Sequence, residues 1–287
     1  MTISMRRDDY DQIINHGVKA CLMEEMLGVV KGFFSLPWEE KVKYASNDVM
    51  HPVRYGTSLN TPLAHTRHWR DYLRHYGHPV ETTIHLWPHN PTNYREVAKE
   101  YLEELWRLLV DLAGVISEGL GLDREHMEMF LGHGFQPIAN NYYPPCPEPQ
   151  LTLGLAAHSD HGFLTILLDN GVQGLQVKHD DRWVTVPRIP GAFIVNAGDC
   201  LEMLTNGRYK SVEHRAVVNK ESARISIGVG SGPHLDTMVA PLRHLCEEDG
   251  GPKFKPVVYG DYVRLQQSIT SRGKNALQVA LSTPSDS

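Results

Sequence analysis

Apolar residues recur at helical spacing in the first half of the chain. In segment 18–34 they fall at every third or fourth position, which predicts a helix with one buried face. A short helix is expected over PWEEKVKY, because proline fits a first helical turn. A longer stripe follows residue 93, and its expected buried residues are Tyr94, Val97, Tyr101, Leu105, Leu108, Leu112, Ile116 and Leu120.

Polar residues mark where these helices start. Asn93 and Glu96 have the spacing of a capping box, which predicts that the long helix begins at this point. Asp123 is expected to cap one more short helix, over REHMEMFL. Segment 50–91 is rich in His, Pro, Thr and aromatic residues without a clear period, and it is expected to be irregular.

After Gly134 the pattern changes to short apolar runs separated by turn residues. The runs are PIANNYY, LTLGL, FLTILL, GLQVKHD, RWVTV, AFIVN, HRAVVN, RISIGVG and TMVAPL. Many short strands at this spacing predict a β-sandwich or barrel, and GDYVRLQQSI is expected to be a helix packed against its outside. The predicted fold class is mixed α/β: a helical part over 1–134 and a jelly-roll core with a C-terminal helix over 135–287, forming one domain.

Charge and composition exclude several classes of protein. A formal net charge of −6 argues against a general nucleic-acid binder. The most apolar long stretch carries Arg107, Asp111 and Glu118, so no membrane span is expected. The chain has 4 cysteines without a CxxC pair, which predicts reduced thiols in a cytoplasmic protein.

Ionisable residues stand beside an apolar run in AHSDHGFLTILL. His158 and Asp160 are two apart, so an extended backbone would point both to one face. His214, at the start of a later predicted strand, is the best candidate for a third ligand. Two histidines and one carboxylate form the facial triad of non-haem Fe(II), which leaves coordination positions open. A satisfied core pair and a zinc site are the alternatives.

Arg224 and Ser226, in RIS, are again two apart and are expected to share one face of a strand. A guanidinium beside a hydroxyl inside a barrel suits a carboxylate. Near a metal, the natural ligand is a diacid that chelates the metal with one end and meets Arg224 with the other, which describes 2-oxoglutarate. Arg224 could instead serve as a structural ion-pair partner.

The stretch NYYPPCPEP (141–149), HSD with a distant His, and RIS occur in this order. This combination resembles the plant 2-oxoglutarate/Fe(II)-dependent dioxygenases, from about Ile13 to about Leu277. NGVQGLQVKHDDRWVTV and GDYVRLQQSITSRGKNAL are similar to the branch with flavanone dioxygenase-like, salicylate hydroxylase-like and melatonin hydroxylase-like members. The resemblance implies a double-stranded β-helix, which is a form of jelly roll.

The resemblance also implies the roles of individual residues. It places Fe(II) on His158, Asp160 and His214. It places 2-oxoglutarate on Arg224, Ser226, Tyr143 and Asn141, although NYYPP also makes a structural turn. Oxidative decarboxylation of 2-oxoglutarate to succinate and CO2 then drives O2-dependent hydroxylation or desaturation of a small, aromatic plant-type metabolite or hormone: a flavonoid, an indoleamine or a phenolic acid. Ascorbate is expected as a reductant, and the enzyme is expected to be a monomer without nucleic-acid or membrane partners.

Two departures from the family pattern bear on substrate and activity. Family members carry a strand and a helix before the equivalent of QIINHGV, where this chain has MTISMRRDDYD, so we expect a shortened N-terminus. Gly230 stands where many flavonoid-using relatives have an aromatic residue that stacks on the substrate. Tyr72 is a candidate for the substrate mouth, with a core position as its alternative. The rival functions are an inactive truncated paralogue that binds or regulates, and an oxidase that uses the same iron site without 2-oxoglutarate, as aminocyclopropane-carboxylate oxidases do.

Overall fold

Two antiparallel sheets form the centre of the protein. The computed structural model describes residues 10–57, 68–268 and 273–282. The larger sheet has seven strands in the order β1 (Asp11–Ile13), β9 (Phe193–Ala197), β6 (Leu164–Asp169), β11 (Arg224–Gly230), β4 (Gln136–Tyr143), β3 (Asp71–His78) and β2 (Val53–Thr57). The smaller sheet has the order β5 (Leu155–His158), β10 (His214–Ala216), β7 (Leu175–His179) and β8 (Arg182–Thr185). A two-stranded sheet of β12 (Met238–Val239) and β13 (Val257–Val258) completes the set.

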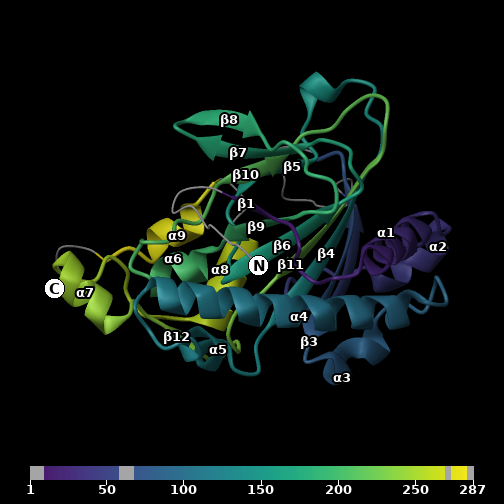
Figure 1. The fold of residues 1–287 in the computed structure, drawn as a ribbon. Coiled ribbons are helices and arrows are strands. Elements are labelled where there is room, and N and C mark those ends of the chain that lie inside the picture. Colours follow the sequence, from purple (N-terminus) through teal and green to yellow (C-terminus); the bar gives the residue numbers. More distant parts are fainter. Residues whose placement is uncertain (1–9, 58–67, 269–272, 283–287) are drawn as a thin grey trace.

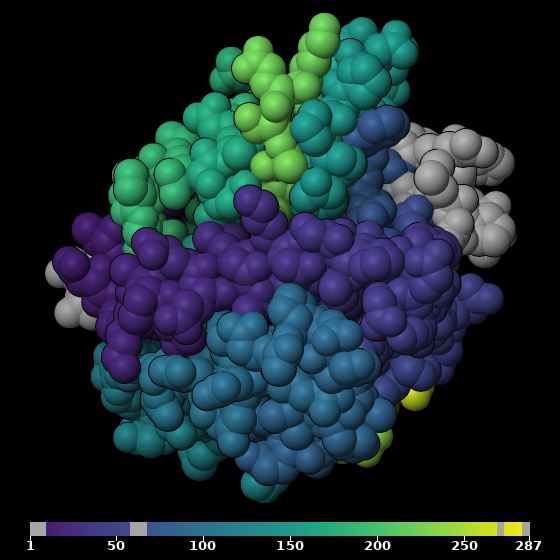
Figure 2. Space-filling view, turned by 90° about the vertical axis from the view of Figure 1, so that its right-hand side faces the viewer, coloured from purple at the N-terminus to yellow at the C-terminus, as the bar shows by residue number. Residues whose placement is uncertain are grey.

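The sheets and helices are arranged in layers. Figure 1 shows the smaller sheet at the top, the larger sheet below it, and α4 (Tyr94–Gly119) along the other side of the larger sheet. α1 (Ala20–Phe34) packs beside α4 and contacts β4 and β11. Figure 2 shows the purple N-terminal part of the chain as a band across one face of the molecule. The mixed α/β jelly-roll fold predicted from the strand pattern is therefore confirmed.

The helical stripes predicted from the sequence are buried as expected. In α1 the buried residues include Leu22, Met26, Val29, Val30 and Phe33. In α4 every expected residue from Tyr94 to Ile116 is buried, whereas Leu120 follows the helix and is half-buried. These faces pack with inward residues of the larger sheet in one continuous hydrophobic core, which fixes the sheet against the helical layer.

Segment 50–91 was expected to be irregular, and this prediction is wrong in its described part. It contains β2 and β3, the helix α3 (Val80–Thr83) and a 3-10 turn at Ile84–Leu86. Along β2 and β3 burial alternates with the period of a strand. The pattern was hidden because the unburied alternate positions carry arginine and tyrosine rather than simple surface residues. Residues 58–67 lie outside the described part of the chain.

Several local predictions are also corrected. Asn93 and Glu125 are the N-cap residues of α4 and α5 (His126–Leu131), but neither caps by a side-chain hydrogen bond, so the capping box and the Asp123 cap do not form. The run LTLGL is not a strand, because β5 begins only at Leu155 and a 3-10 turn covers Pro149–Leu151. The last long helix, α8 (Tyr259–Ser268), occurs where expected.

Short helices supplement this framework. Those not anticipated are α6 (Asp199–Leu204), α7 (Arg243–Asp249) and α9 (Asn275–Val279), and the helix predicted after proline is α2 (Trp38–Lys41) with a 3-10 turn at Val42–Tyr44. All four cysteines are free. Within the described residues, we find no helix with the length and apolar character needed to cross a bilayer.

Candidate functional site

A cavity of about 1550 Å³ collects every candidate residue from the sequence. Strands of both sheets line it, so it occupies the inside of the jelly roll. Its lining includes His158, Asp160, His214, Arg224, Ser226, Tyr143, Asn141, Tyr72 and Gly230. Residues far apart in sequence thus meet in one space, as expected for a binding site.

The three expected metal ligands converge in this cavity. His158 ends β5 and His214 begins β10, and the two residues are directly opposite each other in the smaller sheet. Asp160 lies in the loop after β5. The expectation that an extended backbone carries both His158 and Asp160 therefore holds for His158 alone. Oδ1 of Asp160 is 3.8 Å from Nε2 of His158 and 3.8 Å from Nε2 of His214. One ligand atom from each residue lies within 4.8 Å of the others, a group that can hold a metal ion.

Hydrogen bonds orient these side chains for metal binding. Nδ1 of His158 donates to the Ala156 carbonyl at 2.9 Å, and Nδ1 of His214 donates to the Val212 carbonyl at 3.1 Å. Both Nε2 atoms therefore present a lone pair toward Asp160. Asn196 donates to Oδ2 of Asp160 at 3.0 Å and leaves Oδ1 facing the histidines. Such partners fix the tautomer and the orientation of metal ligands.

The electrostatics also favour a cation. Burial lowers the pKa of His158 to about 4, with His214 acting in the same direction, so the His158 ring is neutral near pH 7. Burial alone would raise the pKa of Asp160, but the facing His214 and His158 rings outweigh it and hold the pKa well below its usual range. A neutral imidazole and an ionised carboxylate are the protonation states that bind metal.

A buried carboxylate behind the triad connects its two ligand segments. Asp199 in α6 accepts hydrogen bonds from Ser159 at 3.0 Å, from Ser211 at 2.6 Å and from Tyr262 at 2.8 Å. Ser159 lies between the ligands of the first segment, and Ser211 lies shortly before His214. Burial raises the pKa of Asp199 to about 6. The sequence did not predict this role for Asp199, because Gly198 and Asp199 together have the composition of a turn.

His161 follows the ligand pair in sequence but is not part of the metal group. Its Nδ1 lies 3.0 Å from the Tyr259 hydroxyl, and burial lowers its pKa to about 4. The side chain lines the cavity beside the triad. His161 therefore lies beside the metal group and is not one of its three members.

The candidate cosubstrate residues face one another across two strands. β11 pairs with β4 so that Arg224 is opposite Tyr143 and Ser226 is opposite Asn141. Because alternate residues of a strand share a face, all four line the same side of the larger sheet. The Asn141 amide is already engaged, since its oxygen accepts from Arg70 at 3.0 Å.

Arg224 is a buried guanidinium with unused hydrogen-bonding capacity. It is 2 % exposed, its Nε donates to the Val172 carbonyl at 3.1 Å, and its carbon lies 5.3 Å from the centre of the Tyr143 ring. One terminal nitrogen is 3.7 Å from Oδ2 of Asp169, and this buried nitrogen has no hydrogen-bond partner among the described residues. An arginine in this state fits a ligand carboxylate.

The substrate candidates also lie in the cavity wall. The Tyr72 ring packs over Gly56, where a Cβ would lie 2.6 Å from the ring, and the half-buried side chain lines the cavity rather than the hydrophobic core. A Cβ at Gly230 would approach Pro137 to 3.3 Å, so a larger residue would require Pro137 to move. The structure adds lining residues that sequence reasoning missed, among them Arg54 and Arg74.

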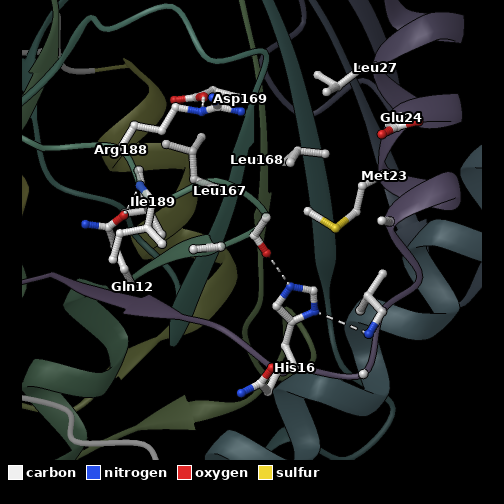
Figure 3. A pocket seen from close by; sticks show the side chains of 17 residues that line it. Gln12, His16, Met23, Glu24, Leu27, Leu167, Leu168, Asp169, Arg188 and Ile189 are labelled. Atoms are coloured by element: carbon white, nitrogen blue, oxygen red, sulfur yellow. Dashed lines mark hydrogen bonds and ion pairs between the residues drawn. The ribbon is translucent and has the colours of Figure 1, made fainter.

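A second cavity, of about 340 Å³, lies between the N-terminal segment, α1 and the larger sheet. Figure 3 shows His16 in its wall, with one ring nitrogen bonded to the Gly191 carbonyl and the other to the Val18 amide. Arg188 and Asp169 pair at 3.6 Å at the other side. None of the candidate site residues lines this space.

Known proteins share both the sequence and the fold of this chain. Residues 134–233 match the model of the 2OG-Fe(II) oxygenase superfamily. Residues 6–92 match the model described as non-haem dioxygenase in morphine synthesis N-terminal. Protein DOWNY MILDEW RESISTANCE 6 of Arabidopsis thaliana is 41% identical over 262 residues, which cover 90% of this chain and 77% of that protein. The chain belongs to the 2-oxoglutarate/Fe(II)-dependent oxygenases.

Further similarities of this oxygenase agree with the assignment. Flavanone 3-dioxygenase 2 of Oryza sativa subsp. japonica is 40% identical over 90% of this chain and 76% of its own length. The crystal structure of JOX2 in complex with 2OG, Fe and JA matches with a TM-score of 0.90 and 36% identity, covering 96% of this chain and 83% of that one. This oxygenase is an oxidoreductase that uses Fe(II) and 2-oxoglutarate, and the alternatives of an inactive paralogue and of a 2-oxoglutarate-independent oxidase are not favoured.

Proposed function

We propose that this oxygenase hydroxylates or desaturates a small aromatic plant metabolite or hormone at the cavity inside the jelly roll. His158, Asp160 and His214 hold Fe(II). Arg224 and Ser226 hold the far carboxylate of 2-oxoglutarate, with Tyr143 and Asn141 beside them. The observation that carries the proposal is the convergence of two oriented imidazoles and a carboxylate in the same cavity as a buried arginine, one terminal nitrogen of which has no hydrogen-bond partner among the described residues.

The protein's own residues bind the metal and the cosubstrate and orient them in the cavity. When bound, Fe(II) and 2-oxoglutarate supply the oxidising power through O2-dependent decarboxylation of the cosubstrate to succinate and CO2. Backbone carbonyls hold the imidazoles of His158 and His214 in the tautomer that offers Nε2. Arg224, which is 2 % exposed, orients the cosubstrate by charge.

The substrate class rests on relatives and on the shape of the site. The names of similar proteins refer to flavanones and to jasmonate induction, and a structure with 26% identity is named for auxin oxidation. Flavonoids, indoleamines and phenolic acids are therefore the first compounds to screen. Gly230 removes the stacking face expected for a flavonoid, so the smaller classes have priority.

Further parts of the proposal concern the whole protein. We place it in the cytoplasm as a monomer that needs no nucleic acid or membrane and uses ascorbate to keep iron reduced. The net charge of −6 supports the absence of a nucleic-acid partner, and the four free cysteines support the cytoplasmic location. Residues 1–134 and 135–287 act as one domain, which agrees with the position of β1, β2 and β3 in the same sheet as β4 and β11.

Metal binding tests the assignment directly. Anaerobic protein is titrated with Fe(II) and 2-oxoglutarate, and the visible charge-transfer band of the chelate is measured for wild type, His214→Ala and His161→Ala. We expect a band of 1:1 stoichiometry in wild type and in His161→Ala, and none in His214→Ala. His161 is the matched control, because it is a buried histidine of the same cavity outside the triad. A folded wild type without a band, or a folded His214→Ala protein with one, would refute the proposed site.

A further inference from the structure

The wall of the cavity on β2 and β3 carries an unusual pair of like charges. Arg54 and Arg74 are directly opposite each other in the β2–β3 register, so both side chains are on one face, and both line the cavity. Like charges in directly opposed positions of a sheet destabilise it. An arrangement of this kind is explained when an anion lies between or beside the two guanidinium groups.

The protein offers these arginines only neutral partners. Nε of Arg54 donates to the Ser46 carbonyl at 3.3 Å. Arg74 donates to Oε1 of Gln267 at 2.8 Å and to the Val49 carbonyl, while its buried Nε has no hydrogen-bond partner. Neither arginine forms an ion pair with any carboxylate in the described part of the chain. Burial lowers the pKa of Arg74, and repulsion by Arg54 adds more to this shift than Asp48 takes away.

The other acidic groups in the lining are already committed. Asp160 faces the two histidines of the triad, and Glu213 pairs with Lys178 at 3.4 Å. Lys274 is neutralised by Glu202 at 2.6 Å. Arg54 and Arg74 are thus two directly opposed cations of this wall, neither of which pairs with a carboxylate of the described residues.

A row of small residues extends from the arginine pair toward the middle of the sheet. The registers place Arg74 opposite Ala139 of β4, Ala139 next to Gly228 of β11 across the β4–β11 pairing, and Gly228 opposite Leu167 of β6. All of these residues line the cavity. A Cβ at Gly228 would make only ordinary contacts, at 3.7 Å from Leu167 and 3.9 Å from Thr165, so the floor here is open.

We propose that the substrate of this site is a small carboxylic acid, whose carboxylate binds between Arg54 and Arg74 and whose apolar body lies over Ala139 and Gly228. This inference rests on the proposed function and narrows its substrate class to anions. Two guanidinium groups supply charge-assisted hydrogen bonds to the carboxylate. The row of small residues leads from the arginine pair toward β6, whose Thr165 side chain hydrogen-bonds to Asp160 of the triad.

Binding to the loaded enzyme tests the proposal without the need for turnover. The protein is first loaded anaerobically with Fe(II) and 2-oxoglutarate, and loading is checked by the visible band. Isothermal titration calorimetry then measures benzoate, phenylacetate, cinnamate and indole-3-acetate, each against its primary amide. We expect at least one acid to bind about 10- to 100-fold more tightly than its amide, the range for charge-assisted hydrogen bonds.

Variants assign the preference to the arginine pair. Arg54→Gln is expected to remove most of the acid-over-amide preference, Arg54→Lys to keep part of it, and Gly228→Leu to weaken acid and amide alike by filling the floor. Arg243→Gln, in exposed α7, is the charge-matched control and should leave both affinities unchanged. Loaded wild type that binds no acid of the panel, or amides as tightly as acids, overturns the inference and leaves the proposed function standing. A folded protein that cannot be loaded overturns both. Should Arg54→Gln not fold, the wild-type ratio and Arg54→Lys still decide the outcome.

Discussion

Removal of the Arg224 guanidinium is the sharpest test of how the cosubstrate is held. In Arg224→Ala the bound 2-oxoglutarate loses its only buried cationic partner on β11, while Ser226 and Tyr143 stay in place. Truncation of one partner of a buried charge pair costs about 2 to 5 kcal/mol, which is about a 30- to 5000-fold weaker affinity. We expect the mutant to need that much more 2-oxoglutarate to develop the visible band in anaerobic Fe(II) titrations.

The same region provides a matched control. Asp169 pairs with Arg224 from inside the barrel at 3.7 Å and with Arg188 from the second cavity at 3.6 Å. Arg188→Ala removes an equal charge from the same carboxylate, but Arg188 is 44% exposed. An exposed pair contributes about 0 to 1 kcal/mol, so the affinity should change by no more than about fivefold. A folded Arg224→Ala protein with wild-type affinity, or equal losses in the two variants, would show that our reasoning about the clamp is wrong.

Two further predictions concern groups around the site and in the core. Asp199→Asn replaces an acceptor oxygen by a donor and leaves one of its three hydroxyl partners unsatisfied. We expect about 10- to 100-fold weaker Fe(II) affinity in competition with a chelator, whereas exposed Asp261→Asn should have no effect. Burial lowers the pKa of His75 from 6.5 to about 4, so the unfolded chain binds more protons between pH 6.5 and 4, and stability falls as the pH falls through that window. The His75 contribution is about 3 kcal/mol across the window, and thermal unfolding of His75→Gln should show a flatter dependence on pH than wild type. An unchanged slope would contradict this assignment.

The candidate metal ligands were easier to predict from the sequence than the residues that surround and position them. Few residue types bind Fe(II), so type and spacing made His158, Asp160 and His214 candidates, and the family resemblance assigned iron to them. Asp160 nevertheless reaches the histidines from a loop, which its spacing did not predict. Ser159 is buried and bonded to Asp199, and such a contact between distant segments leaves no periodic signal in sequence.

The strands β2 and β3 escaped prediction for a physical reason. Their apolar alternate residues, such as Val53 and Leu73, are buried in the core, while Arg54, Tyr72 and Arg74 face the cavity. Apolar-inward patterning assumes that the second face of a strand meets solvent. Here the second face meets a ligand space, and its large polar residues look like loop composition. The alternation of Val53, Arg54 and Tyr55 in VRYGT was the signal that could have identified β2 as a strand.

Chemistry and recognition come from different stretches of the chain. The triad and the cosubstrate arginine all lie within residues 134–233, whereas Arg54 and Arg74 belong to β2 and β3 at the far end of the larger sheet. His158 and His214 lie on β5 and β10 of the smaller sheet, so side-chain changes at Arg54 or Arg74 do not touch the strands that carry the two histidines. The division of these roles between two sheets therefore allows the wall that contacts the substrate to be altered at Arg54 or Arg74 while the metal group stays unchanged.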